Sequence, residues 1–153
     1  MSEMYLLDNN VLGMLGKLRR ESTFFRAHCR IPAEVAHEAR RVAYAKSLDA
    51  ISVPVTPEIL DMLTEVMKAI PVGSTDMVNL YDNKGAADPV LVATALALNH
   101  PRVPTLFDER WVVVTNDKAV HATAKQFKVE TLLPGQLAQV IDQALATGQT
   151  SRS

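Results

Sequence analysis

Met4-Tyr5-Leu6-Leu7-Asp8, followed by Asn9-Asn10, is the stretch that decides the fold. Four apolar residues lead into one acid, and an apolar run this short is typical of a buried strand. Residues 11–15 (VLGML) then favour a helix, so Asp8 is expected where a strand passes into a helix. Because ligands bind beyond the carboxyl ends of the strands in open parallel sheets, the sequence predicts a functional site around Asp8.

Length and composition predict one domain over residues 1–147 of the 153-residue chain, with residues 148–153 as a disordered tail. The net charge of −1 does not by itself indicate a nucleic-acid partner. The single cysteine, Cys29, excludes an internal disulfide and suits a reducing cytoplasm. No apolar run approaches the ~20 residues that a membrane helix needs, and the N-terminus lacks signal-peptide features. A cytoplasmic chain without a membrane partner is therefore expected.

Strands alternate with helices along the chain. Residues 111–115 (WVVVT) are the clearest strand because they are aromatic and β-branched and are apolar on both faces. Further extended segments are expected at 30–32, 47–55 and 129–133, and helices at 21–29, 33–46, 56–70, 88–98, 117–127 and 134–146. Residues 72–85 are expected to form a loop. This alternation predicts an α/β fold with a mainly parallel sheet flanked by helices.

Four acids stand where chemistry is possible. Asp8 and Asp117 follow strands, Asp88 begins a helix, and Glu38 lies within one. The three aspartates are also well placed to cap helices by accepting hydrogen bonds from unpaired backbone N–H groups. Glu38 alone suits a surface position on a helix. For any one of these acids, the structural role is the better interpretation.

Taken together, the acids predict a metal site. Asp8 and Asp117 both end apolar strands, so a parallel sheet brings them to the same edge. Gathered carboxylates raise each other's pKa values, and a divalent cation removes this repulsion. Oxygen ligands without His or Cys suit Mg²⁺ or Mn²⁺. Such an ion could activate water and stabilise charge on a phosphodiester during in-line attack.

Basic residues are concentrated near this predicted site. Eight of the 16 lysines and arginines lie between Lys17 and Lys46, where three acids oppose them. A basic face beside an acidic pocket suits a nucleic-acid backbone, whereas the plainer interpretation is a solvated pair of helices. The candidate binding residues are Arg19, Arg20, Arg40 and Arg41.

The ordered motifs resemble those of PIN domains. Residues 6–12 (LLDNNVL) resemble the opening Asp-x-Asn signature, and Ile31-Pro32 followed by Glu38 is similar to the second motif. Residues 85–95 (GAADPVLVATA) resemble the third, and residues 113–118 (VVTNDK) resemble the fourth, a strand that ends in Thr-x-Asp. The motifs span nearly the whole chain, whose small size most resembles the VapC-type toxins of toxin–antitoxin pairs.

The resemblance implies a three-layer sandwich and an endoribonuclease that depends on Mg²⁺ or Mn²⁺. It also implies an RNA substrate, a protein antitoxin and a homodimer. The metal-binding and catalytic acids would be Asp8, Glu38, Asp88 and Asp117, supported by Asn10 and Thr115. Glu34 lies one helical turn before Glu38 and competes with it as the second acid. Partner contacts are expected at apolar residues exposed on the early helices: Leu12, Leu15, Phe24 and Phe25.

Two other functions match less of the sequence. A PIN-like fold that only binds RNA or protein would keep the architecture, but the retention of all four acids argues against it. A phosphatase like the haloacid dehalogenases also uses an Asp at the end of the first strand. That class needs a second acid two residues later, where this chain has Asn10.

Overall fold

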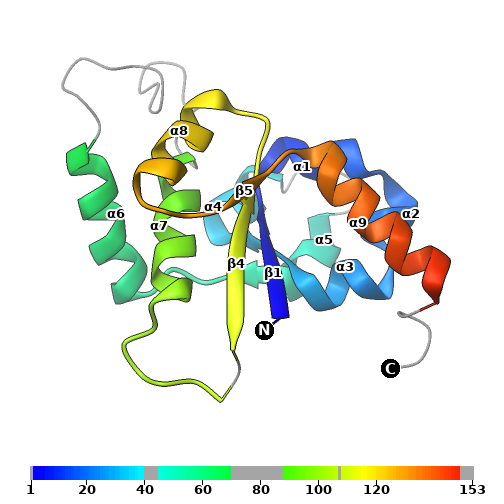
Figure 1. Ribbon diagram of the computed structural model, residues 1–153, viewed down its shortest axis with the longest axis horizontal. Coiled ribbons are helices and arrows are strands. Elements are labelled where there is room, and N and C mark those ends of the chain that lie inside the picture. Colours follow the sequence, from blue (N-terminus) through cyan, green and yellow to red (C-terminus); the bar gives the residue numbers. More distant parts are fainter. Residues whose placement is uncertain (1, 40–44, 70–87, 107, 149–153) are drawn as a thin grey trace.

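A parallel sheet forms the centre of the computed structural model, which describes residues 2–39, 45–69, 88–106 and 108–148. Within these ranges, five strands pair in the order β3-β2-β1-β4-β5, all of them parallel (Figure 1). The strands are β1 (Ser2–Leu7), β2 (Cys29–Pro32), β3 (Ser52–Val53), β4 (Glu109–Val114) and β5 (Thr131–Leu132). The predicted α/β class with a mainly parallel sheet is confirmed.

Both faces of the sheet are covered by helices, because its strands are apolar on both sides. Tyr5 and Leu7 of β1 pack into one core, and Met4 and Leu6 pack into the other. The first core is covered by α1 (Asn9–Leu15), α3 (Thr23–His28), α4 (Ala33–Glu38) and α9 (Pro134–Thr147). The second is covered by α6 (Pro57–Ala69), α7 (Asp88–Asn99) and α8 (Lys118–Gln126) (Figure 1). The result is three layers.

The segment before β3 differs from its prediction. Residues 47–55 were expected to be extended, but α5 (Ala45–Leu48) and the 3₁₀ turn η2 (Asp49–Ile51) occupy most of it. Leu48 and Ile51 are both buried in the first core. Their spacing of three residues places both on one side of a helical turn, which an extended chain would not do. Of the predicted helix 33–46, residues 40–44 lie outside the described ranges, as do the predicted loop 72–85 and residues 149–153 of the tail.

The prediction that the early helices expose apolar contact residues is wrong for three of four residues. Leu12, Leu15 and Phe25 are at most 3% exposed, and Phe24 is partly buried against the same core. They are buried because α1, α3 and the C-terminal helix α9 pack together on the same face of the sheet. Within the described ranges, no helix combines the length and the apolar character needed to cross a membrane.

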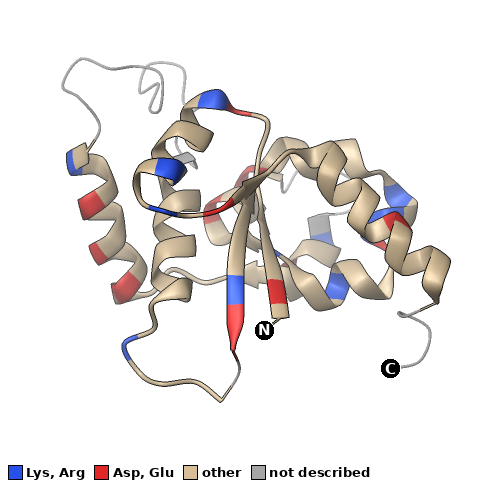
Figure 2. Ribbon diagram, viewed as in Figure 1, with Lys and Arg blue, Asp and Glu red and all other residues tan. Residues whose placement is uncertain are grey.

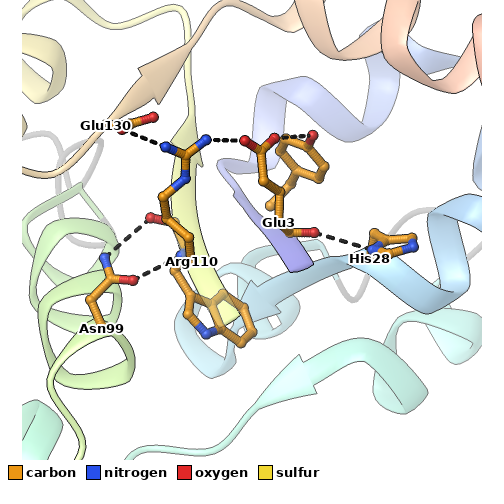
Figure 3. A network of polar contacts seen from close by, with 7 residues as sticks. Glu3, His28, Asn99, Arg110 and Glu130 are labelled. Carbon is orange, nitrogen blue, oxygen red and sulfur yellow. Dashed lines mark hydrogen bonds and ion pairs between the residues drawn. The ribbon is translucent and has the colours of Figure 1, made fainter. Parts of the chain in front are cut away.

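Polar side chains hold the amino edge of the sheet together, as Figure 3 shows. Arg110 on β4 forms an ion pair with Glu3 on β1 and a second one, at 2.9 Å, with Glu130. The side chain of Asn99, at the end of α7, accepts from the N–H of Trp111 at 2.8 Å and donates to its C=O at 3.2 Å. These contacts fix α7 to the start of β4.

Candidate functional site

Asp8 lies at the carboxyl edge of the sheet, directly after the central strand β1, and is only 8% exposed. Its backbone N–H continues the strand pairing by donating to Val114 at 3.1 Å. Its Oδ1 accepts from the Asn9 N–H at 2.7 Å, which caps α1. Burial raises the pKa of Asp8, although the hydrogen bonds from Asn9 and Thr115 lower it, and the charge of Asp117 raises it further. A second carboxylate is therefore close to this buried acid.

Thr115 connects the two aspartates. Its buried hydroxyl donates to Asp8 Oδ2 at 3.0 Å and accepts from the Asp117 backbone N–H at 3.1 Å. Asp117 in turn caps α8, because its Oδ1 accepts from the Ala119 N–H at 2.8 Å. The capping role foreseen for Asp8 and Asp117 is thus real. It does not exhaust these groups, since each carboxylate oxygen carries two lone pairs.

His121 contacts the backbone carbonyl of Thr115. Its Nε2 lies 2.7 Å from the Thr115 carbonyl oxygen, and its Nδ1 lies 2.8 Å from the hydroxyl of Thr131 on β5. Because a carbonyl oxygen can only accept, Nε2 carries the hydrogen. In the neutral ring, Nδ1 then accepts from Thr131. His121 and Thr115 therefore link β5 and α8 to Asp8 through hydrogen bonds.

Replacing His121 by Ala should lower the free energy of unfolding by about 1–3 kcal/mol, because the Thr115 carbonyl loses its side-chain donor. His121→Gln keeps an N–H donor and should lose less. Urea denaturation of both variants measures the difference. If both variants lose the same amount, ring packing rather than the hydrogen bond accounts for the loss.

Glu38 is the last residue of α4, which follows β2 directly, and β2 pairs with β1. The residue is exposed, yet its carboxyl group is partly desolvated, and this desolvation raises its pKa. The charges of Asp8 and Glu34 raise the pKa of Glu38 further, and His37 lowers it. The pKa of Glu38 therefore responds to the charge of Asp8.

Asp88 begins α7 at the same edge of the sheet. The other end of α7 is bound at Asn99 to Trp111, near the start of β4. With 12 residues, α7 runs about 18 Å back along the sheet. Its first residue therefore lies toward the carboxyl edge (Figure 1). The side chain of Asp88 lies outside the described part of the structure.

The remaining predicted residues differ in their surroundings. Asn10 is exposed in the first turn of α1, whereas Thr115 contacts Asp8 directly. Arg19 donates through Nε and Nη2 to the two oxygens of Asp142, each at 2.9 Å, so this guanidinium pairs α2 (Lys17–Arg20) with α9. Arg20 lies on the same short helix, and Arg40 and Arg41 fall outside the described residues.

One residue of this network, His121, was not identified by the sequence reasoning. The four histidines lack the spacing of metal ligands, so the sequence pattern assigns His121 no role. The available signal was its position four residues after Asp117, one helical turn away. That spacing lets a side chain on α8 reach back over the end of β4.

The three described acids can supply oxygen ligands, but they do not form a complete metal cage by themselves. Among the described residues, no group of three or more His, Cys, Asp or Glu side chains is close enough to hold a metal ion. The charge of Asp117 raises the pKa of Asp8, and the charge of Asp8 raises the pKa of Glu38. The arrangement is therefore an acidic edge with one buried and two more accessible carboxylates.

No family model matches this chain, and no curated protein is significantly similar to it. What is established is an α/β fold with a five-stranded parallel sheet, in the order β3-β2-β1-β4-β5, that carries acids at its carboxyl edge.

Proposed function

We propose that the chain is a metal-dependent endoribonuclease of the PIN type, similar to VapC toxins. In the proposed reaction, water adds to the phosphorus of an RNA phosphodiester and the bond to the leaving ribose oxygen breaks. The proposal takes RNA as the substrate and Mg²⁺ or Mn²⁺ as the cofactor. A protein antitoxin and a second copy of the chain are the proposed partners.

One observation carries the proposal: three carboxylates, from sequence positions 8, 38 and 117, lie close enough at one sheet edge for their charges to act on Asp8 and Glu38. The charge of Asp117 raises the pKa of Asp8, and the charge of Asp8 raises that of Glu38. Holding like charges together costs free energy, and a bound cation would offset that cost. The repulsion between these carboxylates thus supports a cation-binding role in addition to helix capping.

The available donor atoms suit a hard divalent cation. Asp8, Asp117 and Glu38 offer carboxylate oxygens, and Asp88 begins α7 at the same edge. When bound, the cation would supply charge neutralisation and Lewis acidity toward the phosphodiester. The chain's own contribution is rigidity: Asn9 and Thr115 hold both oxygens of Asp8, so the carboxylate is oriented in advance.

A binding-only PIN-like module is the second candidate. Its support is that capping explains Asp8 and Asp117 without any metal, since both accept hydrogen bonds from the first turn of a helix. In that case, the fold would keep its acids for stability and would bind RNA or protein without cutting it. The two candidates differ in whether a divalent cation binds and whether RNA is cleaved.

The deciding experiment is cleavage of total and transfer RNA in Mg²⁺ or Mn²⁺, compared with EDTA. We expect cleavage in either metal, none in EDTA, and a loss of more than about 100-fold in Asp88→Asn. Metal titration calorimetry on the wild type accompanies the assay. If the metal binds in calorimetry but no RNA is cleaved, the result counts against the tested RNAs as substrates. If the metal does not bind and no RNA is cleaved, the result favours the binding-only module.

A further inference from the structure

A concave site lies apart from the acids of the proposed metal site. It is a pocket of about 790 Å³ between α2 and α3 on one side and α5 with η2 on the other. This volume lies within the range of about 300–1,000 Å³ that is usual for ligand sites. The described residues of its lining include none of the four acids assigned to the proposed metal site. The pocket therefore calls for a separate explanation.

The rim of the pocket is basic. Among the described residues, its lining includes four cations, contributed by α2, α3 and α5, against the single acid Glu21: Lys17, Arg20, Arg26 and Lys46. Figure 2 shows basic residues on these three helices. Glu21 lies 4.0 Å from Lys17, but both side chains are mostly exposed, so solvent weakens that pair. The pocket therefore favours an anionic ligand.

The two arginines of the rim are held in place by backbone carbonyls. Arg20 Nη1 donates to the carbonyl oxygen of Leu12 at 2.6 Å, and Arg26 Nη2 donates to that of Glu21 at 2.5 Å. The carbonyl oxygen of Glu21 orients the Arg26 guanidinium without cancelling its charge. Such preorganisation reduces the entropy that is lost when a ligand binds.

The floor of the pocket is apolar. Phe25, Leu48 and Ile51 line it, and all three belong to the first hydrophobic core. A small inorganic anion would contact the cations and leave the apolar part of the pocket unoccupied. A ligand with both a phosphate and a flat, weakly polar body would satisfy the rim and cover the floor, and a nucleoside phosphate has both parts.

The pocket lies near enough to the acidic edge to be reached by one strand of RNA. Helix α1 has seven residues and begins directly after Asp8, so it is about 10 Å long. Lys17, the first residue of the pocket lining, follows α1 by one residue. We propose that the pocket binds a nucleoside phosphate. One part of this inference rests on the proposed function, namely that the bound nucleoside phosphate is a nucleotide of the RNA substrate at a distance from the cleaved bond.

The test measures binding without cleavage. A fluorescent single-stranded RNA is titrated with the full chain in EDTA, and nucleoside monophosphates, inorganic phosphate and an acidic peptide are titrated by calorimetry. Arg26→Glu and Lys46→Glu are each expected to raise the Kd for RNA about tenfold and to reduce the salt slope of log K by about 0.7. The matched control is Lys125→Glu, an equal charge change on the exposed last turn of α8.

The outcomes separate the possible ligands. Weaker binding of RNA alone in both pocket variants supports an RNA nucleotide, and weaker binding of the mononucleotide as well supports a free nucleotide too. Pocket variants that bind RNA like Lys125→Glu would overturn the proposal. It is also overturned if inorganic phosphate binds as tightly as a nucleoside monophosphate, or if only an acidic peptide binds.

This result is independent of the proposed chemistry. If the wild type cuts RNA but the pocket variants bind it normally, the pocket inference fails and the nuclease proposal stands. If the wild type binds a nucleoside phosphate in the pocket and never cuts RNA, the pocket inference stands and the nuclease proposal fails. Melting temperatures of Arg26→Glu and Lys46→Glu confirm that each variant is folded.

Discussion

Replacing Asp8 by Asn is expected to reduce RNA cleavage by more than about 100-fold, while the melting temperature at neutral pH stays equal to that of the wild type or rises. Activity is lost because the central carboxylate of the acidic edge disappears. The fold is retained because Asn also caps helices well and can still accept from the Asn9 N–H. Cleavage assays and thermal denaturation of the same preparation measure both effects.

The sign of the stability effect follows from the raised pKa of Asp8. Burial is its main cause, and the charge of Asp117 adds to it. The unfolded chain has an Asp pKa of about 3.9, so the folded state holds this proton more tightly. The resulting stability is fully present below the unfolded pKa and is lost as the pH rises through the folded pKa. Asn avoids that loss, so the advantage of Asp8→Asn should be present at neutral pH and fade on acidification.

Asp142→Asn is the matched control, because its sign is opposite. The hydrogen bond from Arg19 lowers the pKa of Asp142. Its stabilising effect is present above the unfolded pKa and is lost as the pH falls through the folded pKa. Asp142→Asn should therefore lower the melting temperature at neutral pH and leave cleavage unchanged. If Asp8→Asn behaved like this control in either respect, the buried carboxylate would be structural.

The sheet and the position of two acids could be predicted from the sequence because they depend on local patterns. An apolar run that ends in an acid marks β1 and Asp8, and the same pattern marks β4 and Asp117. Strands separated by helices pair in parallel, and parallel strands end at one edge. The meeting of Asp8 and Asp117 therefore required no knowledge of distant contacts.

Burial in the first core could not be predicted in the same way, because distant segments decide it. Leu15 and Phe25 lie on short helices whose sequence patterns do not indicate which side is covered. They are buried because α9, more than 100 residues later, packs on the same layer. The role of His121 was missed for a related reason, since its contacts to Thr115 and Thr131 depend on how α8 lies over the ends of β4 and β5.

Replacing Glu38 by Gln should reduce cleavage by more than about 100-fold, whereas Glu34→Gln should change it by less than about threefold. The two variants form a matched pair, because both remove one carboxylate from α4 and lie one helical turn apart. Their surroundings differ. Burial and the charge of Asp8 raise the pKa of Glu38, while Glu34 acts on it only as the weaker second charge. Single-turnover cleavage at saturating enzyme, with Mn²⁺ calorimetry on both variants, compares them.

The pH dependence of Glu34→Gln provides a second, independent reading of the same pair. Glu34 contributes to the raised pKa of Glu38, so removing its charge should lower that pKa. If cleavage requires ionised Glu38, the acid limb of the pH–rate profile then moves to lower pH in Glu34→Gln. A profile that stays in place, together with a large loss of rate in Glu34→Gln, would exchange the two roles. The second acid would then be Glu34, and Glu38 would be a surface charge that responds to Asp8 without taking part in the reaction.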